Sequence, residues 1–277
     1  MNVRLTILCE NTAGLPHGVV GEHGFACFIE TPGGDYLFDT GQGLGIGRNA
    51  AVLGKDISRI QALVLSHGHF DHTGGLPEVL RRTGSVDVFA HPDIFRERFW
   101  AGKHERRYNG IPFRRDYLES LGARFRLNRG FMEVAPGLFL SGEVPRQTSF
   151  ETGDSHLVVP CEDGTFEADP FRDDFSLALD TPAGLVLVLG CAHAGLVNIL
   201  RHFVEKTGRE RIYAVVGGTH LAPAGEEQFA ETLKALREFS PRKIGVSHCT
   251  GFTRAARLNE EFGGRFFFGT VGTVLEA

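Results

Sequence analysis

A dense cluster of metal-binding residue types begins at His67. The motif His67-x-His69-x-Asp71-His72 lies in the segment VLSHGHFDHTGG, directly after an apolar run. Imidazole and carboxylate are ligands that zinc, iron and manganese accept in proteins. Residues two apart project to the same side of extended backbone, so His67 and His69 can hold one ion together. The neighbouring glycines let Asp71 and His72 face a second ion. A polar turn with chance histidines is the weaker interpretation, because unpartnered polar groups near a core are costly.

Further candidate ligands follow other apolar runs. The segments VLGCAH, VVGGTH, GVSHCTG and LFDTG deliver His193, His220, His248 and Asp39. In α/β folds the residues just past the strands meet along one edge, where ligand sites gather. Two ions need more protein ligands than the four of the motif. We therefore expect histidines from these strand ends to complete the site.

Hydrophobic periodicity predicts the elements that position these residues. Strands are expected at residues 3–10, 25–31, 36–41, 59–69, 86–91, 184–190, 211–220, 243–248 and 265–275. Helices are expected at residues 76–84, 194–208 and 226–241, each ended by glycine or proline. This order predicts an α/β fold of two sheets with helices outside. Residues 1–277 are expected to form a single domain, with an irregular insert rich in arginine and aromatic residues at about 92–150.

Composition and charge exclude several classes of function. The chain has 277 residues, 42% of them hydrophobic, and a formal net charge of −5, which argues against broad contacts with nucleic acid or membrane surfaces. No apolar run is long enough to span a bilayer, and we expect no signal peptide. The five cysteines are scattered, without a Cys-x-x-Cys pair, as expected of reduced thiols. We predict a cytoplasmic protein that acts on a small molecule; its oligomeric state stays unknown.

The His-x-His-x-Asp-His motif, preceded by the strand that ends in FDTG, resembles the metallo-β-lactamase fold superfamily. The resemblance covers most of the chain and implies a four-layer αβ/βα sandwich, with metals in the cleft between two sheets. It implies a first ion held by His67, His69 and His193, and a second held by Asp71, His72 and His248. Asp39 would orient the ligand loop from behind the ligands.

The end of the strand at residues 184–190 departs from the superfamily pattern. Many members end this strand with Gly-Asp, and that aspartate bridges the metals, whereas here the strand ends Gly190-Cys191. Cys191 can take the bridging place or pack behind the ligands, and the bridge can also be an oxygen of solvent or substrate. We predict one or two divalent transition metals, with zinc expected and manganese or iron as alternatives.

Other segments resemble one branch of the superfamily, the dihydropterin–(ribofuranosyl)aminobenzene 5′-phosphate synthases of methanogens. These segments are GEHGFACFIET, SGEVPR, GCAHAGLVN, GGTHL and HCTG. The branch condenses a dihydropterin diphosphate with an arylamine ribose phosphate and releases diphosphate. The resemblance therefore implies an anionic, phosphorylated substrate. In these segments and the ligand motif, we predict substrate-binding roles for Arg146, His23 and Asn198, and catalytic roles for Asp71 and His220.

Arginine and aromatic residues are candidates for substrate recognition. Arg146 has the forked geometry to clamp a phosphate, although a loop arginine is more often solvated. The run RERFWAGKHERRYNG, which begins at Arg96, mixes cations with Trp100 and Tyr108. It is either a solvated face or a lid over an anionic aromatic ligand.

Three classes of function are compatible with this site. A divalent ion lowers the pKa of bound water toward about 7 and polarises P–O or C–O bonds, which suits a hydrolase of phosphoesters, lactones or thioesters. The same ligands suit the condensation, in which an arylamine attacks the pterin methylene, but transfer also needs an aromatic slot that excludes water. A non-hydrolytic metal- or ligand-binding protein ranks third. Diiron members tend to carry Glu at the second His of His-x-His and a flavodoxin domain, whereas this chain has His69.

Overall fold

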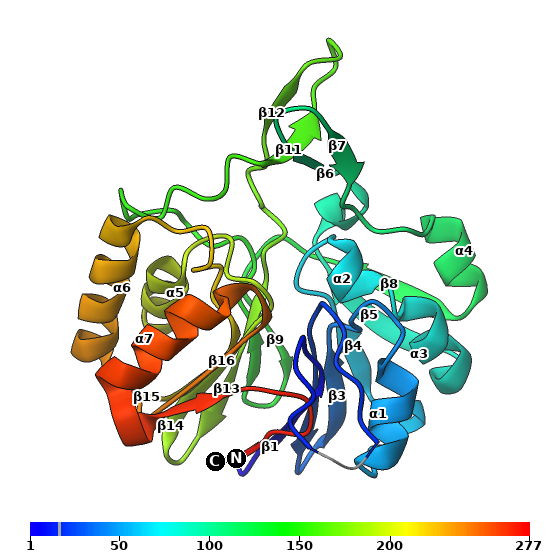
Figure 1. The fold of residues 1–277 in the computed structure, drawn as a ribbon. Coiled ribbons are helices and arrows are strands. Elements are labelled where there is room, and N and C mark those ends of the chain that lie inside the picture. Colours follow the sequence, from blue (N-terminus) through cyan, green and yellow to red (C-terminus); the bar gives the residue numbers. More distant parts are fainter. Residues whose placement is uncertain (16–17) are drawn as a thin grey trace.

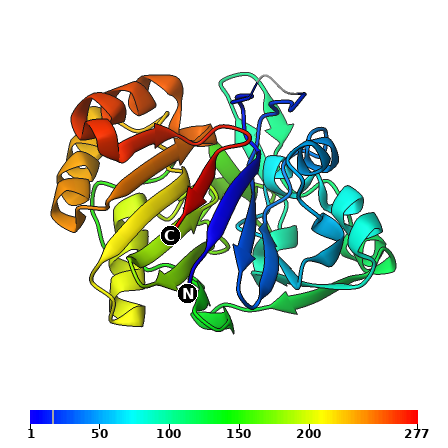
Figure 2. The ribbon, with the colours of Figure 1, turned by 90° about the horizontal axis from the view of Figure 1, so that it is seen from below.

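Two facing sheets with helices on their outer sides form the body of the molecule (Figure 1). The computed structural model describes residues 1–15 and 18–277. On the outside of one sheet lie α1 (Ile46–Val52), α3 (Leu76–Thr83) and α4 (Arg115–Ser120). On the outside of the other lie α5 (Leu196–Thr207), α6 (Glu226–Phe239) and α7 (Phe252–Phe262). Figure 2 shows the same layers from below, with both termini near the seam between the sheets. The predicted four-layer αβ/βα sandwich is confirmed.

Each main sheet has seven strands in the described residues. The first has the order β18-β1-β2-β3-β4-β5-β8, with bounds Val274–Glu276, Arg4–Cys9, Ala26–Thr31, Gly34–Phe38, Ala62–Val64, Val86–Ala90 and Ala123–Leu127. The second has the order β17-β16-β15-β14-β13-β10-β9, with bounds Phe266–Phe268, Lys243–Ser247, Ile212–Gly218, Gly184–Leu189, Ser176–Thr181, Leu138–Leu140 and Met132–Ala135.

Apolar layers separate the sheets from each other and from their helices. Along β14, Leu187 packs with the layer beneath α5 and α6, whereas Val186 and Val188 pack between the two sheets. Strand side chains alternate between faces, so a strand buried on both faces reads as an unbroken apolar run. None of the helices in the described ranges is both long and apolar enough to cross a bilayer.

Parallel pairing gathers the carboxyl ends of the strands at one edge. β3, β4, β5 and β8 pair in parallel, and so do β14, β15, β16 and β17. The segments that leave β3, β4, β14, β15 and β16 therefore emerge on the same side of the molecule. This topology brings the candidate ligands into one region, as their positions after the predicted strands had indicated.

The final predicted strand and the predicted helix ends differ in detail from the structure. The run at 265–275 divides into β17 and β18, which join different sheets, because the chain crosses the seam through Gly269 and Gly272, the latter at φ 89°. The helix expected at 226–241 ends at Phe239, and Ser240 turns into the left-handed region at φ 47°. Pattern alone locates an element more reliably than its boundary.

The segment at 92–150, expected to be irregular, contains short regular elements. It supplies η2 (Pro92–Phe95), β6 (Phe99–Ala101), β7 (Arg106–Tyr108), α4, β8, β9 and β10. β6 and β7 join β11 (Leu157–Pro160) and β12 (Phe166–Ala168) in a third, four-stranded sheet. This sheet stands above the carboxyl edge of the main sheets, at the top of Figure 1. Strands of three or four residues are too short to show a hydrophobic period.

A buried arginine anchors the third sheet to the metal-ligand motif. Arg98 was expected in a solvated or lid-forming run, but its side chain is only 2% exposed. It donates to Asp169 Oδ2 at 2.7 Å and to Asp173 Oδ1 at 2.6 Å. Asp173 Oδ2 in turn accepts a hydrogen bond from the backbone N–H of Gly68 at 2.8 Å. The position of the motif therefore depends on this buried ion pair.

Arg98→Met is expected to lower the free energy of unfolding by about 3–5 kcal/mol, because it leaves a buried carboxylate unpaired. Burial raises the pKa of Asp173 to about 6 although Arg98 opposes the shift. The loss should therefore be larger above pH 6, where the unpaired carboxyl must ionise, than well below it. Denaturant unfolding of Arg96→Met, which removes the partly exposed pair with Glu167, is the control, with a loss under about 1 kcal/mol. Equal losses in the two variants would refute the anchoring role.

Candidate metal centre

The chain between β4 and α3 turns sharply to present the histidines of the motif. His67 and His69 lie in the turn before the short helix α2 (Phe70–Thr73). At Gly68 an added Cβ would lie 2.4 Å from the carbonyl oxygen of Ile94. Only glycine fits such a close approach of two backbones, so the residue between the two histidines is set by packing against η2.

Four non-glycine residues at the strand ends adopt left-handed backbone conformations. The φ angles are 60° at Asp39, 58° at Ala192, 47° at His220 and 52° at His248. Such conformations cost of order 1–3 kcal/mol each and persist only where the surroundings hold them; they cluster at functional sites. Three of these four residues were proposed from the sequence as site residues.

The first group of candidate ligands consists of His67, His69 and His193. A ring nitrogen of each lies within 4.8 Å of the other two, and His67 Nε2 is 2.9 Å from His69 Nδ1. Burial lowers the pKa of all three imidazoles well below the usual value. Nε2 of His69 and both nitrogens of His193 have no hydrogen-bond partner in the described part of the chain. These rings are neutral and present their lone pairs to one place.

The second group forms around Asp71. Its Oδ2 lies 3.2 Å from His248 Nε2 and 3.1 Å from His23 Nε2. Its Oδ1 has no partner among the described residues. Burial alone would raise the pKa of Asp71, but His72 and the other histidines hold it well below the usual range. His72 Nε2 completes the group at 3.3 Å from His248 Nε2. Asp71 is therefore an ionised candidate ligand surrounded by imidazoles.

Asp39 supports this group from behind. Its Oδ2 lies 2.7 Å from His72 Nδ1 and accepts from Ser66 Oγ at 2.6 Å. The backbone N–H of Ser66 donates to Asp39 Oδ1 at 2.7 Å. A carboxylate at Nδ1 fixes the ring so that Nε2 faces the site. Burial would lower the pKa of His72, but Asp39 and Asp71 raise it to about 9, so a metal must displace a proton from this ring.

The donors of both groups fit divalent transition metals. Buried ring nitrogens and a buried carboxylate oxygen lack partners within residues 1–15 and 18–277, and native proteins rarely leave such groups unsatisfied. Imidazole with carboxylate suits zinc, iron or manganese. His67, His69 and His193 would hold one ion, and Asp71, His72 and His248 would hold another.

A cavity of about 590 Å³ opens onto these ligands. His69, Asp71, His193 and His248 form its floor, and the third sheet contributes to its roof. The roof and one wall are formed by Trp100, Arg107, Tyr108, Asn109, Asp154 and Leu157. The cavity therefore combines a floor of candidate metal ligands with an aromatic and partly basic cover.

The structure brings two of the predicted substrate-facing residues to this cavity. His23 and His220 line it. His220 packs against His193 with 4.3 Å between ring centroids, and its Nε2 lies 3.7 Å from Asp154 Oδ2. Burial lowers the pKa of His220, but Asp154 and Cys249 raise it to about 9. His220 is therefore protonated at neutral pH beside the candidate metal site.

Arg146 and Asn198 are not among the described residues that line this cavity, and their substrate-binding roles stay predictions. Arg146 is exposed, and its guanidinium donates to the carbonyl oxygen of Pro170 at 3.3 Å. Asn198 is buried, and its side-chain oxygen accepts from the N–H groups of Gln147 and Thr148 at 3.0 and 3.1 Å. The amide is fully occupied in holding the loop that carries Arg146. The sequence could not separate this structural role from ligand binding.

Sequence reasoning missed Asp154 and the position of His23 among the candidate metal ligands. His23 was expected to bind substrate, and it also joins Asp71 and His248 in a potential metal cluster. Asp154 was not proposed, because it lies in the loop segment ETGDSH without a strand before it. Trp100 and Tyr108 belong to the run considered as a lid, and they do line the cavity. The mixture of aromatic and basic residues was the available signal.

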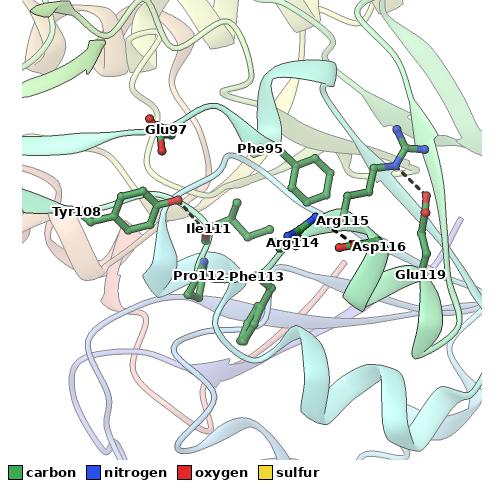
Figure 3. Close-up of a pocket in the computed structure, with 10 residues that line it drawn as sticks. All are labelled: Phe95, Glu97, Tyr108, Ile111, Pro112, Phe113, Arg114, Arg115, Asp116 and Glu119. Atoms are coloured by element: carbon green, nitrogen blue, oxygen red, sulfur yellow. Dashed lines mark hydrogen bonds and ion pairs between the residues drawn. The ribbon is translucent and has the colours of Figure 1, made fainter. Parts of the chain in front are cut away.

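A second cavity, of about 750 Å³, lies on the outer side of the insert (Figure 3). Tyr108 lines both cavities, and its hydroxyl donates to the carbonyl oxygen of Ile111 at 2.8 Å. In Figure 3 Arg115 pairs with Glu119 one turn further along α4. Within the described chain, its lining side chains include no buried polar atom without a partner. This cavity therefore offers no group prepared for chemistry.

Comparison with known proteins identifies the family. Residues 20–248 match the model of the metallo-beta-lactamase superfamily. The chain therefore belongs to this superfamily, and the resemblance seen in its sequence is confirmed.

Three similar proteins each cover nearly the whole chain. The 7,8-dihydropterin-6-methyl-4-(beta-D-ribofuranosyl)-aminobenzene-5'-phosphate synthase of Methanocaldococcus jannaschii is 33% identical over 271 residues, which cover 94% of this chain and 92% of that protein. The crystal structure of Tm1679, described as a metal-dependent hydrolase of the beta-lactamase superfamily, has a TM-score of 0.85 at 28% identity and covers 99% of both chains. A diphosphatase from the PhnP family shares the fold, with a TM-score of 0.56 at 14% identity over 100% of this chain and 98% of its own.

Replacing His67 and His69 together by alanine is expected to remove at least one bound ion per chain, because two of three ligands of the first group are lost. Metal content after loading with zinc and dialysis, measured by plasma mass spectrometry, tests this. His104→Ala is the control, since His104 is exposed and outside every cluster of candidate ligands in the described residues. An unchanged metal-to-protein ratio in the double variant would contradict the assignment.

Proposed function

We propose that this protein is a metal-dependent enzyme that condenses a dihydropterin methyl diphosphate with an arylamine ribose phosphate and releases diphosphate. The observation that carries the proposal is the cavity in which candidate metal ligands face an aromatic and basic roof. The 33% identity to the methanogen synthase over nearly the whole chain supports the same reaction.

The roof suits a planar, anionic substrate. The Arg107 guanidinium lies 5.0 Å from the centre of the Trp100 ring, and His156 stacks on Trp100 with 5.7 Å between centroids and 11° between planes. Aromatic faces favour stacked rings, and a guanidinium binds phosphate oxygens through its fork. A pterin or aminobenzene ring could therefore pack near Trp100 while Arg107 contacts a phosphate.

The condensation needs a nucleophile, a leaving group and a place for one proton. The arylamine nitrogen forms a bond to the methylene carbon, the carbon–oxygen bond to diphosphate breaks, and the amine loses a proton. Divalent ions held by the two ligand groups would neutralise the negative charge of the leaving diphosphate. The chain's own residues would then bind, orient and exchange protons with the reactants.

His220 and Asp71 are suited to that proton exchange. His220 lines the cavity and carries a proton at neutral pH, because Asp154 helps raise its pKa to about 9. It can therefore donate a hydrogen bond to a leaving oxygen. Asp71 is ionised and has one carboxylate oxygen without a partner in the described residues. That oxygen can bind metal or accept a proton from the nucleophile.

Hydrolysis is the second candidate function. Tm1679, at 28% identity and a TM-score of 0.85, is described as a metal-dependent hydrolase. With water as the nucleophile, the same residues would cleave a phosphoester, lactone or thioester. The distinction depends on whether the roof excludes water from the substrate.

Turnover of a defined panel tests the proposal. Protein loaded with zinc, manganese or iron is expected to consume the two condensation substrates and form the coupled product with diphosphate, measured by mass spectrometry. Diphosphate should inhibit competitively against the dihydropterin substrate, because it reproduces the leaving group. Faster hydrolysis of neutral lactones or thioesters, without inhibition by diphosphate, would replace the synthase proposal with the hydrolase. Metal binding without turnover of any panel member would favour a binding protein.

Arg107→Ala is expected to raise KM for the phosphorylated substrate about tenfold or more, since a hydrogen bond to a charged group contributes about 1.5–3 kcal/mol. Steady-state kinetics measure this effect. Arg114→Ala is the control, because Arg114 lies at the second cavity (Figure 3) and should leave KM unchanged. The same measurement on Arg146→Ala tests the phosphate clamp that the sequence suggested. An unchanged KM in Arg107→Ala would exclude Arg107 from substrate recognition.

A further inference from the structure

The side chain of Cys191 lies where the two groups of candidate ligands meet. Cys191 follows β14 and is buried. Its Sγ is 3.2 Å from His72 Nε2. In the described chain it belongs to three of the five clusters of potential metal ligands, one with His67 and His72, one with His193 and His220, and one with His248 and Cys249. No other residue belongs to as many of these clusters.

The two ligand groups contain few anionic side chains. The first group, His67, His69 and His193, consists of imidazoles alone. In the described clusters Asp71 is the only carboxylate. Two divalent ions close together repel each other strongly in a buried site, so an anionic ligand between them would lower the energy of the pair. Cys191 Sγ is placed within reach of donors from both groups.

A role as apolar filler fits Cys191 poorly. A cysteine that only fills space packs against apolar side chains, whereas the sulfur of Cys191 faces an imidazole nitrogen of His72. Cys249, the neighbouring cysteine, is engaged differently. Its sulfur accepts from the N–H of His220 at 3.2 Å and donates to the carbonyl oxygen of Cys191 at 3.6 Å. Cys249 belongs to one of these clusters only, so Cys249→Ala tests whether the neighbouring thiol, rather than Cys191, is the sulfur ligand.

We propose that the thiolate of Cys191 is a metal ligand that bridges the two ions. On binding, the S–H bond breaks, sulfur–metal bonds form, and the proton passes to solvent; no oxidant or reductant is needed. Thiolate suits zinc and cobalt as a ligand. The proposal concerns the metal centre alone and does not depend on which substrate the enzyme uses.

Cobalt titration of the full-length protein tests the bridge directly. Sulfur bound to Co²⁺ gives a near-ultraviolet charge-transfer band that imidazole and carboxylate do not give. In the wild type this band is expected to grow with both the first and the second equivalent of Co²⁺. In Cys191→Ala the band should be absent, and Cys249→Ala should retain it at the wild-type intensity. Circular dichroism and thermal unfolding check that each variant is folded.

Cys191→Ser provides a second variant if the alanine variant does not fold, because it keeps the size of the side chain and replaces sulfur by a hydroxyl. Persistence of the band in either folded Cys191 variant would overturn the proposal. So would loss of the band in Cys249→Ala, or no band in wild type that binds cobalt. Growth with only one equivalent would show a ligand to a single ion and reject the bridge. Because no substrate is used, failure here is distinct from failure of the synthase reaction.

Discussion

A cluster of imidazoles is buried between two apolar sheets, and the structure depends on an interaction that offsets the free-energy cost of this burial. Ring nitrogens of His69 and His193 and an oxygen of Asp71 are buried without partners in the described chain. Burying polar groups without hydrogen bonds is costly. A bound metal ion would satisfy these ring nitrogens and this carboxylate oxygen. If ions bind there, their binding free energy also stabilises the fold. The centre is therefore a part of the core as well as a site for chemistry.

The two sheets hold the ligands close together because their strand ends approach each other at the seam. An added Cβ at Gly190 would lie 2.3 Å from Ser66 Oγ and 3.2 Å from Asp39 Oδ2. Gly190 belongs to one sheet's strand end, whereas Ser66 and Asp39 follow strands of the other. This approach places Cys191, the next residue, against His72. A larger residue at Gly190 would push the two ligand groups apart.

The third sheet places aromatic and basic side chains over the candidate metal ligands. Arg98 joins this sheet to the turn of the ligand motif through Asp173 and the N–H of Gly68. Trp100 and Arg107, on β6 and β7, face the cavity over the ligands. Metal ligands of the same kind can serve hydrolysis or condensation. Which of the two reactions takes place therefore depends on whether the side chains above the ligands exclude water from the substrate. The anchored sheet supplies the aromatic and basic side chains that cover the candidate metal ligands.

The sequence by itself determined the fold class and most of the candidate ligands. His67, His69, Asp71 and His72 are close in the chain, and His193 and His248 follow apolar runs. Residues that follow the strands of an α/β fold meet at one edge, so pattern and spacing indicated that these residues gather. Their division into two ligand groups and the four-layer arrangement were implied by the resemblance to the metallo-β-lactamase superfamily. The buried strands and the long helices were likewise predictable, because each shows its hydrophobic period over enough residues.

Only the tertiary structure decided the contacts that depend on distant, weakly patterned segments. The third sheet is built from strands of three or four residues, so no periodicity revealed it. For Arg98 and Arg146 alike, the sequence left both a solvated role and a substrate-binding role open. In the structure Arg98 is buried between two carboxylates, whereas Arg146 is exposed. The side-chain oxygen of Asn198 accepts hydrogen bonds from backbone N–H groups 50 and 51 residues away in the sequence. The sulfur of Cys191 contacts the ring of His72, which is 119 residues away. Such contacts arise from how the sheets and loops pack in space, and local sequence carries no signal of them.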